Sequence, residues 1–145
     1  MRSEARWNDD VDRADAERFR CVTTALLTDH ERLDTWQRAM DLLVESYAIA
    51  KLLPTEERYG LASQLRRAAV SVAANIAEGC GLTSRGDRLR FLAIARGSLC
   101  ELRTLISAVE VLHYAEGSCL IRARELLDQT GQLLSGLRRY LSTRQ

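Results

Sequence analysis

The sequence has no long apolar segment, only one proline and few aromatic residues. No apolar run approaches the roughly 18 residues that a bilayer span requires, and residues 1–20 lack the apolar core of a signal peptide. We therefore expect a cytoplasmic protein. The 145 residues, of which 46% are hydrophobic and 28% charged, are enough for the core of one compact domain.

Histidine and cysteine are scarce and dispersed. The absence of a C-x-x-C pair favours free thiols over a zinc ribbon or a disulfide framework; the cysteines are Cys21, Cys80, Cys100 and Cys119. Glu110 and His113 have the spacing of one ferritin-like ligand pair, but such a site needs a second pair. The only other histidine, His30, precedes the helices, so we expect no metal and no cofactor.

An excess of one charge is also missing, since 21 basic and 20 acidic residues give a net charge of +1. This balance argues against nucleic-acid binding through bulk charge but leaves room for a local basic patch. Every basic residue except Lys51 is an arginine. Genomic base composition can produce that bias, so it is weak evidence for phosphate recognition.

The N-terminal part, residues 1–34, carries nine acidic and six basic residues and few large apolar ones before Phe19. This composition predicts an extension in which residues 1–17 are disordered. The stretch from Phe19 to Leu27 is compatible with either a short helix or a strand.

Four later stretches have apolar residues at helical spacing and predict four helices. They cover residues 35–53, residues 55–78, a stretch from the glycine-rich turn to about residue 113, and residues 119–141. Pro54 ends the first helix, and Thr55 with two glutamates begins the second. Short turns between long helices predict an all-α, antiparallel, up-down-up-down four-helix bundle over residues 35–145.

The expected core positions alternate spacings of four and three residues. In the first helix they are Trp36, Met40, Leu43, Tyr47 and Ala50. In the second they are Leu61, Leu65, Ala68, Val72 and Asn75. In the third they are Phe91, Ala95, Ser98, Leu102, Leu105, Val109 and Leu112. In the fourth they are Leu120, Ala123, Leu127, Thr130, Leu134, Leu137 and Leu141.

Asn75 is the exception among these apolar positions. An unpaired amide in an apolar environment costs about 1–3 kcal/mol, so we expect Asn75 to be at least partly buried. Its amide should bond across to the third helix or to the C-terminal turn of its own helix. A polar line at helical spacing lies beside it, made of Gln64, Arg67, Ser71 and Glu78. The predicted structural polar cluster is Ser71, Asn75, Glu78, Ser98 and Glu101.

The second and third helices are expected to form a hairpin centred near residue 83. This pairing would place Asn75 near Phe91 and Ala68 near Ser98. It would also explain Gly97 and Ser98, which are unfavourable inside a helix, as the point where the two backbones approach closely.

Arginines are concentrated around this hairpin. The predicted nucleic-acid-binding residues are Arg66, Arg67, Arg85, Arg88, Arg90 and Arg96. In the alternative interpretation they pair with carboxylates and only solubilise the bundle. We expect Glu101 near Arg66 or Arg67, and Glu78 near the turn arginines. Few aromatic residues are placed to stack on bases.

Catalysis has little support in the sequence. Ser71 and Ser98 lie among small or apolar residues, and the second helix contains no histidine that could act as a base. We predict no catalytic residue, and we interpret Ser98 as a small packing residue.

Three segments together resemble the protein family of the 23S ribosomal RNA intervening sequence. They are WQRAMDLLVESY, LLPTEERYGLASQLRRAAVSVAANIAEG and FLAIARGSLCELRT, between Trp36 and Thr104. Ala73 stands where the family commonly has a proline. The resemblance implies a small, cytoplasmic, bacterial four-helix bundle without established enzymatic activity. A related branch resembles the accessory protein of diversity-generating retroelements, a pentameric ring that works with a reverse transcriptase and nucleic acid.

Two functional hypotheses follow. In the first, the protein is a non-enzymatic homo-oligomeric adaptor that binds RNA, DNA or a reverse-transcriptase-type partner through its arginines. In the second, it is a purely structural or protein-binding bundle. The resemblance implies a pentamer. Apolar residues beside the core positions also favour self-association; they are Leu42, Ile49, Leu52, Ile121, Leu126 and Leu133. In the monomeric alternative, these residues cover the stretch from Phe19 to Leu27.

Overall fold

The computed structural model describes residues 30–143. The predictions for residues 1–17 and for Phe19 to Leu27 lie outside these residues. A short 3-10 turn, η1 (His30–Arg32), leads into the first long helix, α3 (Asp34–Leu52). The remaining elements are η2 (Thr55–Arg58), α4 (Leu61–Gly81), α5 (Arg85–Val111) and α6 (Gly117–Thr143).

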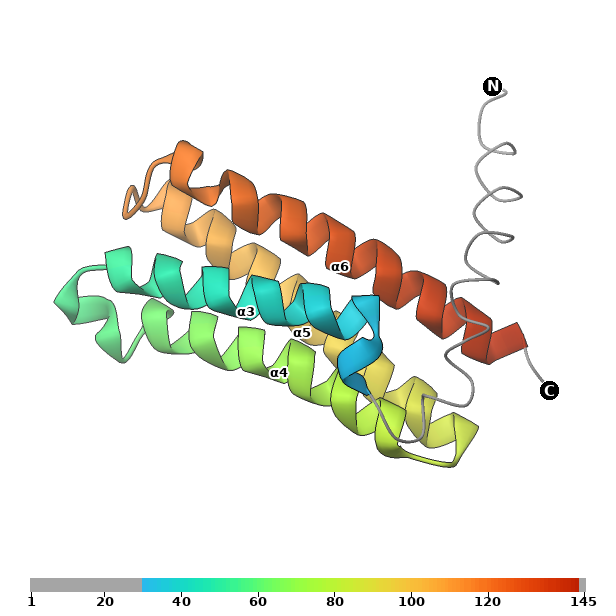
Figure 1. Ribbon diagram of the computed structural model, residues 1–145. Coiled ribbons are helices and arrows are strands. Elements are labelled where there is room, and N and C mark those ends of the chain that lie inside the picture. The colour runs from blue at the N-terminus through green and yellow to red at the C-terminus, as the bar shows by residue number, and fades with distance from the viewer. Residues whose placement is uncertain (1–29, 144–145) are drawn as a thin grey trace, which may run out of the picture.

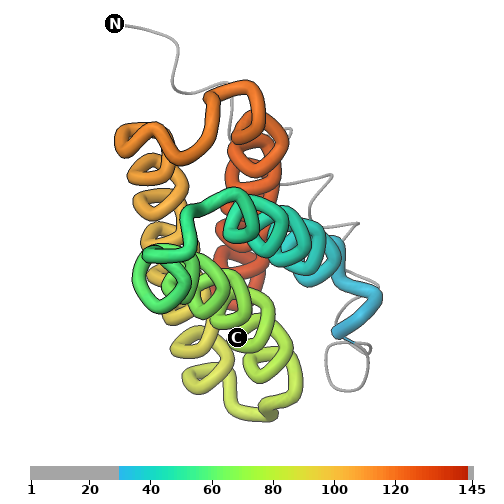
Figure 2. Tube along the Cα trace, turned by 90° about the vertical axis from the view of Figure 1, so that its left-hand side faces the viewer, coloured from blue at the N-terminus to red at the C-terminus, as the bar shows by residue number. Residues whose placement is uncertain are grey.

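The four long helices form an antiparallel bundle. Successive helices run in opposite directions in Figure 1. Helix α3 packs against α4 and α6, and α5 packs against the same two helices. Figure 2 looks roughly along the helices and shows them arranged around a common core. The prediction of an all-α four-helix bundle is confirmed. None of the helices described here is long and apolar enough to cross a bilayer.

The second long helix begins later than expected, because Thr55–Arg58 forms a separate turn. Gly60 breaks the helix with φ −95° and ψ −118°, and α4 starts at Leu61. The Glu57 carboxylate accepts the Leu61 amide at 2.8 Å and so satisfies a free donor of the helix start. It also accepts the Tyr114 hydroxyl at 3.1 Å, a hydrogen bond that raises the pKa of Tyr114.

Helix α5 ends at a backbone motif built around His113. This residue has φ 57°, in the left-handed region. The His113 amide donates to the Glu110 carbonyl at 2.9 Å, and the Tyr114 amide donates to the Val109 carbonyl at 3.0 Å. This is the Schellman pattern, in which two otherwise unpaired carbonyls of the last turn are satisfied. His113 therefore terminates the helix through its backbone.

The predicted core is accurate for α6 and shifted for α3. All seven positions expected in the last helix are buried. In α3 Ala50 is buried as predicted, but the other buried residues lie one position earlier than expected; they are Thr35, Ala39, Leu42, Ser46 and Ile49. Trp36 is half-buried and Tyr47 is 37% exposed. Small residues at Ala39 and Ser46 let α3 approach its neighbours closely, and the bulky aromatic residues lie at its flank.

Similar adjustments occur in α4 and α5. Ile76 takes the core position after Val72, and Asn75 lies half-buried at the edge. Ala95, Ser98, Leu102 and Val109 are buried as predicted. Phe91 and Leu105 are only half-buried, whereas Leu112 is 51% exposed.

The close approach of the hairpin backbones lies at Gly79, so the expectation for Gly97 was wrong. A Cβ added to Gly97 would meet no atom within 4 Å, because this residue faces outward. A Cβ added to Gly79 would lie 3.3 Å from the Phe91 Cβ and 3.4 Å from the Arg88 carbonyl oxygen. Any side chain at Gly79 would push the turn end of α5 away from α4.

The apolar residues taken as evidence for self-association divide into buried, half-buried and exposed positions, with Leu133 half-buried. Leu42, Ile49 and Leu126 are buried inside the single chain, with at most 1% exposure. They therefore give no support for an interface. Leu52 and Ile121 remain 53% and 56% exposed.

Cys80, Cys100 and Cys119 are free thiols, as expected, and Cys21 lies outside the described residues. Cys80 is buried at the end of α4. Burial raises the pKa of its thiol to about 11, opposed by the charge of Arg88. The thiol therefore stays protonated at neutral pH.

Thr130→Val should raise the free energy of unfolding by about 1–2 kcal/mol. The Thr130 hydroxyl is fully buried and has no hydrogen-bond partner within the described residues, so an isosteric methyl removes an uncompensated desolvation cost. Denaturant unfolding monitored by circular dichroism measures the change. The control is Thr104→Val, because that exposed hydroxyl already donates to the Cys100 carbonyl at 3.0 Å. A loss of stability in Thr130→Val would contradict the expectation.

Candidate nucleic-acid interface

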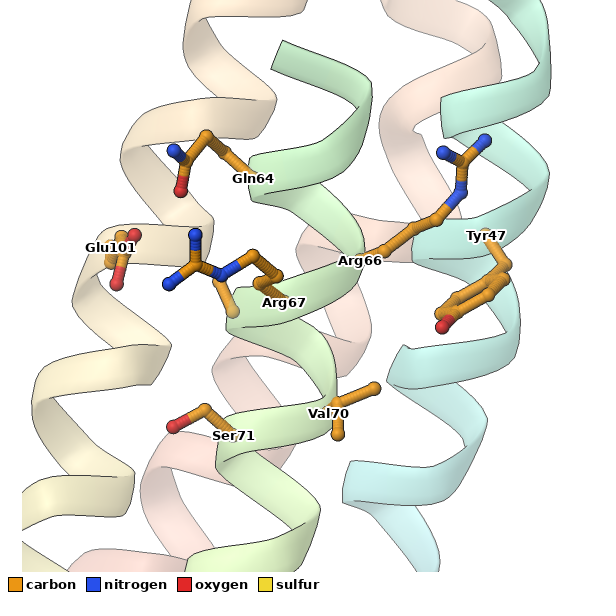
Figure 3. A pocket seen from close by; sticks show the side chains of 8 residues that line it. Tyr47, Gln64, Arg66, Arg67, Val70, Ser71 and Glu101 are labelled. Carbon is orange, nitrogen blue, oxygen red and sulfur yellow. The ribbon is translucent and has the colours of Figure 1, made fainter. Parts of the chain in front are cut away.

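Two consecutive arginines on α4 form the centre of the site. Arg66 is half-buried, and its guanidinium carbon lies 5.8 Å from the centre of the Tyr47 ring on α3. Arg67 is exposed. Adjacent helix positions are about 100° apart, and in Figure 3 Arg66 extends towards Tyr47 whereas Arg67 extends towards Glu101 on α5. The pair therefore spans the outer surface of α4.

These arginines line an open groove of about 410 Å³. We call it the arginine groove, and its lining residues are Tyr47, Gln64, Arg66, Arg67, Ala68, Val70, Ser71 and Glu101. Tyr47 bounds it on the α3 side and Glu101 on the α5 side (Figure 3). The expected proximity of Glu101 to the arginine pair is thus present.

A hydrogen-bonded relay joins α4 to α5 beneath the groove. The Ser71 and Ser98 hydroxyl oxygens are 2.7 Å apart. The Asn75 amide donates to the Ser71 carbonyl at 2.7 Å and to the Ser71 hydroxyl at 3.1 Å. Asn75 is partly buried, as expected, but its amide bonds neither directly across to α5 nor to the C-terminal turn of α4. It reaches back one turn along its own helix, a common alternative for short polar side chains, and Ser71 makes the crossing.

Glu78 takes no part in this relay. Its side chain is exposed and forms no ion pair with the rest of residues 30–143. The turn arginines bind backbone oxygens instead: Arg85 donates to the Ser142 carbonyl and Arg88 to the Leu82 carbonyl. Carbonyls at helix C-termini lack helical partners and carry partial negative charge. Arg85 and Arg88 therefore stabilise the ends of α6 and α4.

The other two predicted arginines lie apart from the groove. Arg90 and Arg96 are exposed on α5. They are six residues apart, so they point to different sides of a helix with about 3.6 residues per turn. The Arg90 guanidinium lies 5.5 Å from the Phe91 ring centre. The structure thus separates the six arginines into a groove pair, a turn pair and two isolated residues.

Four arginines of the described residues are paired with carboxylates, whereas the groove arginines, like Arg58, Arg90 and Arg96, are not. Arg103 pairs with Asp128 at 2.7 Å, and Arg38 pairs with Asp41 at 2.7 Å. Arg122 and Arg124 also have carboxylate partners. In the part of the chain that the structure describes, Arg66 and Arg67 have no carboxylate within 4.0 Å. These two residues therefore do not form the carboxylate pairs that the alternative interpretation expected.

Glu110 and His113 do not form part of a cluster of potential metal ligands among the described residues. Glu110 forms an ion pair with Arg124, and His113 is exposed at the helix end. Within residues 30–143 no group of three potential ligands is close enough to hold a metal ion.

Tyr47 was not among the predicted site residues, because its helical spacing placed this side chain in the core. The signal was present: Ala39, Ser46 and Ile49 form a second line at helical spacing that can bury α3 instead. Burying that line turns Tyr47 towards Arg66 and makes it an accessible aromatic surface.

Ser71→Ala and Ser98→Ala should be energetically coupled by about 0.5–1.5 kcal/mol. Either single variant removes the hydrogen bond between the hydroxyls, so the double variant should lose less stability than the sum of the two. Denaturant unfolding of the four proteins of the cycle measures the coupling. Additive losses would show that this bond does not hold α4 to α5.

The comparisons with known proteins agree with the fold. Curated protein sequences give no significant match. The sequence model described as 23S rRNA-intervening sequence protein matches residues 31–136. The match covers α3, α4, α5 and most of α6, including every residue of the arginine groove. The chain belongs to the 23S rRNA-intervening sequence protein family.

Proposed function

We propose that this protein is a non-enzymatic, homo-oligomeric nucleic-acid-binding protein whose main phosphate contacts are Arg66 and Arg67. The observation that carries the proposal is that these two guanidiniums line one groove and have no carboxylate partner within residues 30–143. Their charge is available to an external anion. The family name refers to 23S rRNA intervening sequences, so RNA is the first probe.

The geometry suits a polyanion better than one small anion. Guanidinium groups bind phosphate through several parallel N–H donors. Arg66 and Arg67 extend to opposite sides of α4 (Figure 3), so they would contact different phosphates along a strand. Arg90 and Arg96 lie further along the hairpin and could add contacts from α5. Arg85 and Arg88 are engaged with carbonyls and are expected to contribute less.

Self-association is the second part of the proposal. Several large apolar side chains remain exposed on the single chain; they include Val44, Leu52, Val70, Ile94, Val111, Leu112 and Ile121. Exposed apolar surface marks an interface where it forms a large patch. The pentameric count comes from the family resemblance alone. If nucleic acids fail to bind, the same apolar surface favours the protein-binding hypothesis, including a reverse-transcriptase-type partner.

Arg66→Gln combined with Arg67→Gln should weaken binding to RNA and duplex DNA and flatten its salt dependence. Each lost phosphate contact reduces the steepness of the fall of log K with log salt by about 0.9 for duplex DNA and about 0.7 for single strands. Fluorescence anisotropy at several salt concentrations measures both effects.

The matched control is Arg122→Gln combined with Arg124→Gln, which removes two paired arginines from α6. This control should leave the slope unchanged. Equal slopes in the wild type and the groove variant would rule out Arg66 and Arg67 as phosphate contacts.

Multi-angle light scattering over a range of protein concentrations should give a mass several times the 16.3 kDa of one chain. A ring of five would give about five times that mass. The mass should not grow further with concentration, because closed cyclic symmetry fixes the number of subunits. A mass of 16.3 kDa at every concentration would refute self-association.

A further inference from the structure

We propose that the arginine groove binds an unpaired nucleotide of an RNA or DNA strand, with its base stacked on Tyr47, its phosphate held by Arg66 and a neighbouring phosphate held by Arg67. This inference rests on the proposed function and adds to it the kind of nucleic acid that is recognised. It assigns a binding role to Tyr47, which the phosphate contacts alone do not require.

Tyr47 offers an accessible aromatic ring next to a phosphate-binding group. Its side chain is 37% exposed although it belongs to a core-forming helix. The Arg66 guanidinium lies 5.8 Å from its ring centre, so ring and cation form one wall of the groove. Aromatic rings and guanidinium planes are the surfaces on which proteins stack unpaired bases. A single nucleotide can span the short distance from ring to cation.

The shape of the groove favours an unpaired base over a duplex. In a duplex the base faces are covered by their neighbours, so only the phosphates would reach the arginines and Tyr47 would make no contribution. The groove volume of about 410 Å³ lies within the approximate 300–1,000 Å³ range of small-molecule sites. An extruded base could enter such a space.

Glu101 on the opposite wall supports the same conclusion. Its carboxylate lines the groove and has no ion-pair partner within the described residues. A carboxylate repels a phosphate that lies directly against it, but it accepts hydrogen bonds from base amino groups. Gln64 on the same side adds an amide that can donate and accept. The α5 side therefore suits the edge of a base.

The test compares a fluorescein-labelled single-stranded RNA oligonucleotide, the matching single-stranded DNA and the corresponding DNA duplex on the full chain. Tyr47→Leu, which keeps apolar volume but removes the ring, should weaken single-strand binding about 5- to 150-fold, the range for one stacked base. Duplex binding should stay unchanged. Tyr47→Phe should bind single strands like the wild type.

The chain offers a matched control at Tyr59. This tyrosine is 87% exposed, and the Arg58 guanidinium lies 5.8 Å from its ring centre, but it is not part of the groove. Tyr59→Leu therefore removes the same kind of arginine–tyrosine contact at another site. It should leave single-strand binding unchanged.

The outcomes separate this inference from the proposed function. The base-stacking site is wrong if Tyr47→Leu weakens the binding of single strands and of the duplex equally, or weakens neither. The phosphate contacts still stand in that case if the Arg66 and Arg67 double variant loses affinity. If the wild type binds no nucleic acid, both proposals fail. A preference of the wild type for RNA over DNA would show that the 2′-hydroxyl is also recognised.

A cross-linking experiment keeps the proposal testable if Tyr47→Leu does not fold. Single-stranded RNA containing 5-iodouridine is irradiated with the wild-type chain, and the adduct is located by mass spectrometry. Cross-linking at Tyr47 supports the stacking site. Adducts at other aromatic residues without any at Tyr47 would overturn it.

Discussion

The contact between α4 and α5 sets the geometry on which the site depends. At the turn, Gly79 lets the two backbones approach, and a Cβ there would lie 3.3 Å from the Phe91 Cβ. Two turns earlier in α4, the Ser71 and Ser98 hydroxyls meet at 2.7 Å. One contact fixes the spacing and the other specifies the register. Together they place Glu101 on the far wall of the arginine groove.

The same helix supplies the core and the proposed binding surface. Leu65 and Ile76 are fully buried on one side of α4, whereas Arg67 is exposed on another. Small residues at Ala68 and Ala69 bring the neighbouring helices close. The arginines are consequently flanked by side chains of α3 and α5, which turns a convex helix surface into a groove. A rigid helical scaffold also holds the guanidiniums in place at lower entropic cost than a loop would.

Sequence periodicity predicted the last helix correctly and the first helix only in outline. Helix α6 has one continuous apolar line, so a single face can be buried. Helix α3 has two adjacent lines, one through Trp36 and Met40 and another through Ala39 and Ile49. Spacing alone does not distinguish them, because burial of the smaller line becomes favourable only when α4 and α6 are in place. The four helices were therefore predicted correctly, whereas the buried face of α3 was predicted wrongly.

The choice of buried face in α3 also limits how much of the site could be predicted from the sequence. The arginine pair is visible in the sequence because the two residues are consecutive. The hydrogen-bond partners of each arginine, however, depend on how the helices pack against one another. Arg85 is occupied because the C-terminal turn of α6 reaches it, a contact between residues far apart in the chain. The position of Tyr47 in the groove could not be predicted for the same reason, since its exposure follows from burial of Ile49 and Ser46. Of the site, the charges were predictable from local sequence, whereas the aromatic wall and the unpaired state of Arg66 required the packed bundle.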